Sequence, residues 1–144
     1  PEDIEVLERQ ITQAGVSGRR LCRGNQRDMW LLYREEELEK ILEKEENRLF
    51  FRTMGYDSFS LPAVLNKVRM RLTAHRDGKG EYPHELGILL GYPLEDVQGF
   101  ISNKGKNYLY SGYWKVYGDV EKARQLFRSY DRARKQMLAD CLAV

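Results

Sequence analysis

The sequence contains few of the residues that build covalent or metal-based sites. Only two cysteines and two histidines occur among its 144 residues. Cys22 and Cys141 lie far apart, which argues against a disulfide framework and against a paired-cysteine zinc or redox motif. His75 and His84 do not form an HExxH pattern. We therefore expect no metal site and two buried or half-buried thiols.

Long apolar runs and a strong charge of one sign are also missing. The longest unbroken apolar run is Met29–Tyr33, far shorter than the roughly 20 residues of a membrane-spanning helix. The 24 lysines and arginines nearly balance 22 aspartates and glutamates, and 42% of the residues are hydrophobic, which excludes an intrinsically disordered chain. No basic and then apolar leader is visible, so we expect a cytoplasmic protein without a membrane partner.

The first half of the chain predicts a helix, a hairpin and further helices. Helical spacing of Ile4, Leu7 and Ile11 predicts a helix that stops at Gly15. The runs Arg19–Arg23 and Met29–Arg34 surround a turn-rich link and predict a β-hairpin. An acidic helix is expected over Glu35–Glu46, continuing after a kink to Gly55. Ser58 or Ser60 is then expected to cap a helix with Pro62 in its first turn.

The second half predicts two short helices, a strand and a long helix. Pro83 and Pro93 each begin a short helix. Tyr113–Tyr117 is expected to be a strand, and Asp119 to cap the last helix. The order favours an α+β fold with a small antiparallel sheet, made of the hairpin plus one later strand, packed with about five to six helices. We expect a single domain over residues 1–144.

No motif for enzymatic chemistry stands out. The stretch Gly99–Lys106 superficially looks like a phosphate-binding loop, but five residues separate its glycines and Asn107 replaces the Ser or Thr that would hold magnesium. A helix end explains it better, with Gly105 in the left-handed conformation. No nucleophile elbow occurs either. The sequence therefore identifies no catalytic residue and no cofactor, and it favours a binding protein over an enzyme.

The block from Pro83 to Asp119 is distinctive. It reads PHELGILLGYPLEDVQGFI, then NKGKN, then GYWKVYGD. This text closely resembles domain-of-unknown-function family 3793, a bacterial family found mainly in anaerobic Firmicutes, and the likeness extends more loosely over nearly the whole chain. Family members usually begin with a further stretch that contains a cysteine and a Pro-Thr-Leu-Ala-Gly-like motif, which we expect this chain to lack before Pro1. The resemblance implies a location for a site but no assigned activity.

The matching block concentrates polar and aromatic residues that packing does not demand. We expect them to line a pocket for a small anionic or planar ligand, or to contact a partner protein. The rings would stack, the lysines would neutralise charge, and His84 with Glu85 would orient polar groups. The ten candidate ligand-binding residues are His84, Glu85, Tyr92, Asn103, Lys104, Lys106, Asn107, Tyr113, Trp114 and Lys115.

Nucleic-acid binding is the alternative. Residues 83–104 have the rhythm of a helix–turn–helix, although Glu95 and Asp96 would face phosphates unfavourably in a recognition helix. The last helix carries basic residues on one face, which would grip phosphates, pair with the acidic helix or remain solvated. The residues of this alternative are Arg124, Arg128, Arg132 and Lys135.

Overall fold

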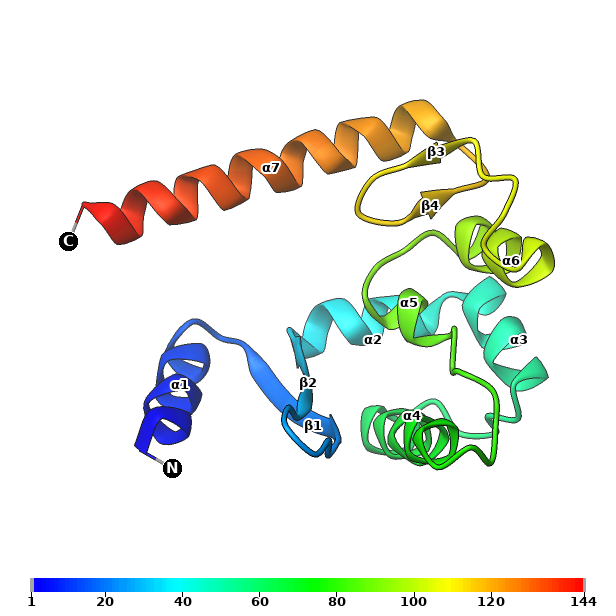
Figure 1. Cartoon of the computed structure of the whole chain (residues 1–144), viewed down its shortest axis with the longest axis horizontal. Coiled ribbons are helices and arrows are strands. Elements are labelled where there is room, and N and C mark those ends of the chain that lie inside the picture. The colour runs from blue at the N-terminus through cyan, green and yellow to red at the C-terminus, as the bar shows by residue number, and fades with distance from the viewer. Residues whose placement is uncertain (1, 144) are drawn as a thin grey trace. The chain divides into compact units, whose positions relative to one another are not determined.

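The computed structural model describes residues 2–143, whose helices and strands are shown in Figure 1. These residues form two compact units, divided between Gly91 and Tyr92. Within the described residues there are seven helices and two separate two-stranded antiparallel sheets, which confirms the α+β class. The expected single domain stays a prediction. None of the helices in residues 2–143 is long and apolar enough to cross a membrane.

Unit 1 opens with α1 (Glu2–Gln13) and the predicted hairpin of β1 (Ser17–Cys22) and β2 (Met29–Tyr33). The two strands are antiparallel, with Arg20 opposite Trp30 and an irregularity in the register just before Cys22. Leu21 and Leu31 are buried, so the hairpin packs one face into the unit. This arrangement leaves Trp30 on the opposite, exposed face, because side chains alternate along a strand.

The predicted kink in the acidic helix is a complete break at Lys44. This residue has an extended backbone and separates α2 (Glu35–Glu43) from α3 (Glu45–Thr53). Side chains from α3 satisfy carbonyls at the end of α2, since Asn47 Nδ2 donates to Ile41 O at 2.8 Å and Arg48 Nε to Leu42 O at 2.6 Å. The break therefore leaves few unpaired carbonyl groups at the helix end.

The rest of unit 1 consists of α4 (Leu61–Arg76) and the short α5 (Leu86–Leu89). Of the two serines that the sequence offered as the cap of α4, Ser60 is the one used, because its hydroxyl accepts from Ala63 N at 3.4 Å. The apolar stripe of α4 is buried together with side chains of α2, α3 and α5. The buried core residues of these helices include Leu38, Leu42, Phe50, Phe51, Val64, Leu65, Val68, Leu72, Leu86, Ile88 and Leu89.

Unit 2 consists of α6 (Leu94–Asn103), β3 (Tyr110–Ser111), β4 (Lys115–Val116) and α7 (Val120–Leu142). The one later strand expected over Tyr113–Tyr117 is thus the second half of a separate small hairpin, in which β3 and β4 pair with each other. A tight turn, with Gly112 N donating to Trp114 O at 3.1 Å, folds the chain back locally.

The start of α7 is buried and its later part is not. Asp119 caps the helix by accepting from Lys122 N at 3.0 Å, as predicted, and Ala123 and Phe127 enter the core of unit 2. Residues 131–143 are all exposed. The free thiol of Cys141 is therefore exposed, which corrects the expectation of a buried or half-buried thiol, whereas the free thiol of Cys22 is half-buried, as expected.

Candidate functional site

A buried carboxylate organises unit 2. Asp96, in the first turn of α6, is 3% exposed and accepts three hydrogen bonds. The donors are Trp114 Nε1 at 2.8 Å, Tyr117 N at 2.9 Å and Gly118 N at 3.0 Å. This carboxylate joins α6 to the segment that leads into α7. Sequence reasoning missed this role, and the one general signal for it was that a buried indole N–H requires an acceptor.

The predicted ligand-stacking aromatics form a cluster around Trp114. The Trp114 ring stacks on Tyr92 at 4.7 Å between centroids and meets Phe127 edge-on at 4.6 Å. Only 8% of Trp114 is exposed, so the indole belongs to the core of unit 2. Tyr113 is more exposed, and its hydroxyl donates to Asp131 at 2.6 Å, a hydrogen bond that raises the pKa of Tyr113. The small hairpin is thereby attached to α7.

The turn after α6 has an unusual backbone. Lys104, Gly105 and Asn107 have φ angles of 51°, 74° and 60°. The left-handed conformation predicted for Gly105 is confirmed. Lys104 and Asn107 are the only non-glycine residues with positive φ between residues 2 and 143. Asn107 tolerates this region easily, whereas a lysine there is uncommon.

Side-chain amides support this turn from within. Asn103 Nδ2 donates to Gly99 O at 2.8 Å, and Asn107 Nδ2 lies 3.5 Å from Asn103 Oδ1. Tyr117 adds a further contact, because its hydroxyl donates to Lys106 O at 2.8 Å. The two asparagines predicted to contact a ligand therefore also hold the backbone of the turn.

Three ammonium groups surround this turn. Lys115 Nζ donates to Gly105 O at 2.8 Å and lies 4.9 Å from the centre of the Tyr108 ring. Lys104 and Lys106 are exposed, and within the described residues their side chains form no ion pair. No acidic residue occurs between Asp96 and Asp119. We call this surface, made of residues 103–108 and Lys115, the lysine turn.

Tyr108 is a member of the lysine turn that sequence reasoning missed. It is 46% exposed and lies beside Lys115, so it combines an accessible ring with nearby positive charge. Its place in the run of tyrosines between residues 108 and 117 was the available signal. Chemically, the lysine turn offers cations and a ring edge or face to an anion that carries a planar group.

The remaining two candidates, His84 and Glu85, belong to unit 1. Glu85 is fully buried, and its carboxylate pairs with Arg71, with Nε at 2.7 Å from Oε2 and Nη2 at 3.3 Å from Oε1. Burial, followed by the negative charge of Glu85, raises the pKa of Tyr56. In this geometry the Glu85 carboxylate joins α4 to the turn that precedes α5.

His84 lies in an aromatic row with the other histidine. Tyr82 is 5.2 Å from His84 and 5.4 Å from His75, measured between ring centroids. His75 Nδ1 lies 3.2 Å from Gly80 O. Partial burial lowers the pKa of His84, against a smaller opposing effect of Glu85. Across residues 2–143, no group of three or more histidine, cysteine or acidic side chains is placed to hold a metal ion.

The residues of the nucleic-acid alternative lie along α7. The Arg124 guanidinium lies 4.8 Å from the centre of the Tyr110 ring, and Arg128 Nη2 is 3.5 Å from Glu121 Oε1. Arg132 and Lys135 are exposed. The helix–turn–helix-like segment 83–104 spans the boundary between the units, with α5 in unit 1 and α6 in unit 2.

Glu95 and Asp96, the two acids at the start of α6, both accept hydrogen bonds from other residues of unit 2, Asp96 in the interior and Glu95 at the surface. Asp96 holds the indole of Trp114, and Glu95 Oε1 accepts from Asp119 N at 3.3 Å. The side chain of Glu95 also occupies the space that a side chain at Gly118 would need. The first turn of α6 is therefore used to hold the start of α7.

Comparison with known proteins identifies a family. No curated protein and no solved structure matches the sequence. A family model described as Protein of unknown function (DUF3793) matches residues 2–143, which is nearly the entire chain and includes both units and the lysine turn. The resemblance first noted at Pro83–Asp119 is therefore confirmed over the full length of the match. The chain belongs to the DUF3793 family.

Proposed function

We propose that this protein is a binding module and that the lysine turn recognises a small anionic ligand with a planar group. The observation that carries the proposal is the left-handed backbone of Lys104. A lysine in this conformation costs roughly 1–2 kcal/mol relative to an unstrained backbone. Such strained residues cluster at ligand clamps and other functional sites.

Electrostatics support an anion as the ligand. Lys104 and Lys106 are exposed on either side of Gly105, and Lys115 is held at the same turn by its hydrogen bond to Gly105 O. Because no acidic residue lies between Asp96 and Asp119, little in this part of the sequence opposes the positive charge. A phosphate or carboxylate would gain charge-assisted hydrogen bonds from these ammonium groups.

The exposed ring of Tyr108 supports a planar group on the ligand. It is 46% exposed, and Lys115 already approaches it as a cation. An aromatic ring beside lysines can stack on a planar molecule whose charged end contacts the ammonium groups.

Thermal denaturation with defined anions tests the proposal. Inorganic phosphate, pyrophosphate, AMP and ATP would be added to the full chain at low salt. A ligand that binds only the folded protein stabilises it by mass action, by about 2.7 kcal/mol when the ligand concentration is 100 times its Kd, and the melting temperature rises accordingly. We expect ATP to exceed pyrophosphate, because it adds a planar base to the same charge type. If none of these anions raises the melting temperature, the proposal is wrong.

Variants locate the site. The double variant Lys104→Ala/Lys106→Ala should lose the ligand-induced shift. The matched control Lys79→Ala/Lys122→Ala removes the same charge at other exposed positions and should keep the shift. Amide chemical shifts of the 17.0 kDa chain should change mainly at residues 103–108 and near Lys115 when ATP is added. Changes confined to another part of the chain would contradict the assignment.

A further inference from the structure

We propose that the turn end of the β1–β2 hairpin binds single-stranded nucleic acid, with its arginines contacting phosphates and Trp30 stacking on a base. We call this surface the hairpin tip and define it as Arg20, residues 23–28, Met29 and Trp30. It lies in unit 1 and shares no residue with the lysine turn of unit 2. The proposal therefore does not depend on the anion-binding function proposed above.

The hairpin is the most arginine-rich segment of unit 1. Residues 17–33 contain four arginines, Arg19, Arg20, Arg23 and Arg27, against a single acid, Asp28, which gives 4 − 1 = +3. Arg23 and Arg27 are exposed, and their side chains form no ion pair within the described residues. Guanidinium groups of this kind bind phosphates in a fork-like geometry.

An exposed indole lies among these charges. Trp30 is 41% exposed and pairs directly across the strands with Arg20, so both side chains occupy the same face of the hairpin. Met29, which directly precedes Trp30, is 42% exposed. A large ring left half in water on a two-stranded hairpin, beside arginines, matches the stacking platforms that bind unpaired bases.

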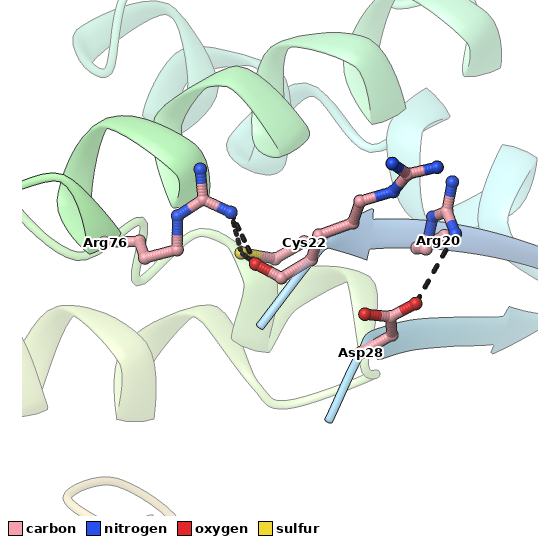
Figure 2. Close-up of polar contacts among 5 residues, drawn as sticks. Arg20, Cys22, Asp28 and Arg76 are labelled. Atoms are coloured by element: carbon pink, nitrogen blue, oxygen red, sulfur yellow. Dashed lines mark hydrogen bonds and ion pairs between the residues drawn. The ribbon is translucent and has the colours of Figure 1, made fainter. Parts of the chain in front are cut away.

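Polar contacts hold the hairpin tip in place (Figure 2). Arg76, from the last turn of α4, donates to Arg23 O and approaches the sulfur of Cys22 at 3.7 Å. Across the hairpin, Arg20 pairs with Asp28 at 3.4 Å. Arg76 also brings a further guanidinium to the tip, although Asp77 offsets part of its charge. These contacts hold the Arg23 backbone and the side chains of Arg20 and Arg76. The side chains of Arg23 and Arg27, in contrast, extend from the tip without an ion pair to any described residue.

Charge separates along the hairpin. The arginines and Trp30 lie toward the turn, whereas the other end of β2 leads into α2, whose first turn contains Glu35, Glu36 and Glu37. A nucleic-acid strand is thus attracted to the tip and repelled from the α2 end. Stacking on Trp30 needs an unpaired base, because a base inside a duplex has both faces covered. We therefore favour a single strand over a duplex.

Fluorescence anisotropy with a labelled dT12 oligonucleotide and the full chain tests this inference. We expect binding at 50 mM NaCl that weakens steeply as salt is raised. Emission from Trp30 should be quenched on binding, while Trp114, at 8% exposure, serves as a shielded reference. The variant Trp30→Phe lacks the Trp30 emission, so adding dT12 to it should cause little quenching of the remaining tryptophan fluorescence. Absence of binding at 50 mM NaCl would overturn the proposal.

Charge variants assign the surface. Arg23→Gln/Arg27→Gln should weaken dT12 binding and reduce the logarithmic salt slope by about 1.4, or about 0.7 for each lost phosphate contact on a single strand. Trp30→Ala should weaken binding about tenfold, the typical effect of one lost stacked base. The control Arg132→Gln/Lys135→Gln removes equal charge from α7 and should leave binding unchanged. Circular dichroism of each variant verifies that it is folded.

Three further outcomes count against the inference. Loss of binding in the α7 control, with retention in the Arg23/Arg27 variant, would move the interface to the last helix. Equal or tighter binding of a 12-base-pair duplex would exclude stacking on Trp30 as the main contact. Competition by poly-glutamate as effective as that by unlabelled dT12 would indicate an acidic protein partner in place of nucleic acid.

Discussion

The carboxylate of Asp96 and the indole of Trp114 meet in the interior of unit 2, with 2.8 Å between Oδ2 and Nε1. The other oxygen of Asp96, Oδ1, accepts hydrogen bonds from the backbone N–H groups of Tyr117 and Gly118. One side chain of α6 thus fixes both a core aromatic ring and the entry into the last helix. Hydrogen bonds to a charged group contribute more than neutral ones, about 1.5–3 kcal/mol each.

Replacing Asp96 should therefore destabilise the protein strongly. We expect Asp96→Ala to lower the free energy of unfolding by about 3 kcal/mol, because it leaves the Trp114 N–H and two backbone N–H groups without their acceptor. Urea unfolding followed by tryptophan emission measures the loss. The exposed Asp140→Ala serves as a control and should change stability by less than about 0.5 kcal/mol. Equal effects of the two variants would contradict this role of Asp96.

The ion pair between half-buried Arg71 and fully buried Glu85 predicts that mutations at the two positions are coupled. Arg71→Met should lower the free energy of unfolding by about 3–5 kcal/mol, because it leaves the fully buried carboxylate of Glu85 without a compensating charge. The double variant Arg71→Met/Glu85→Leu should cost much less than the sum of the single variants. A double-mutant cycle by chemical denaturation measures the coupling. Additive effects would show that the two side chains do not act together.

The strained backbone at Lys104 predicts that relieving the strain raises stability while removal of the lysine weakens anion binding. Lys104→Gly should raise the free energy of unfolding by about 1 kcal/mol, because glycine adopts the left-handed conformation without the penalty that a lysine pays. It should also weaken anion binding by removing one ammonium group. Lys106→Gly is the comparison, because Lys106 is not among the residues with positive φ, and this variant should be slightly destabilised. A destabilised Lys104→Gly variant would contradict the strain.

The environment of His84 predicts a loss of stability in mild acid. Its pKa is lowered in the folded state, mainly by burial, so the unfolded chain takes up the proton first as the pH falls through about 6.5. The contribution of neutral His84 is fully present above that pH and declines below it. Urea midpoints at pH 7.5 and 5.5 should differ more for the wild type than for His84→Gln. The control His75→Gln should keep the wild-type difference between the two urea midpoints. If His84→Gln also keeps that difference, the prediction is wrong.

Elements governed by local signals could be predicted from the sequence. The hairpin followed from two short runs around a turn-rich link, and the caps of α4 and α7 followed from Ser60 and Asp119. Gly105 likewise had the left-handed angle that its position after a helix requires. In each case the deciding interaction joins residues close in sequence, so the pattern contains the information.

Features that depend on distant partners could not be predicted. Asp96 and Trp114 are 18 residues apart, and Arg71 and Glu85 are 14 apart. Nothing local indicates that an acid in the first turn of a helix will accept an indole N–H instead of facing solvent. For the same reason the sequence suggested ligand-binding roles for Glu85 and Trp114, whose side chains are buried in the structure. The pairing of β3 with β4 was missed because each strand has only two residues.

The last helix continues well past the side chains that anchor it. Phe127 is its final buried residue, and residues 131–143 have no covered side. The backbone hydrogen bonds in this stretch can therefore break one helical turn at a time without disturbing the core of unit 2. Amide hydrogen exchange should accordingly slow toward Phe127 and quicken along the chain to Ala143, and limited proteolysis should trim this end first while the fold around Asp96 persists.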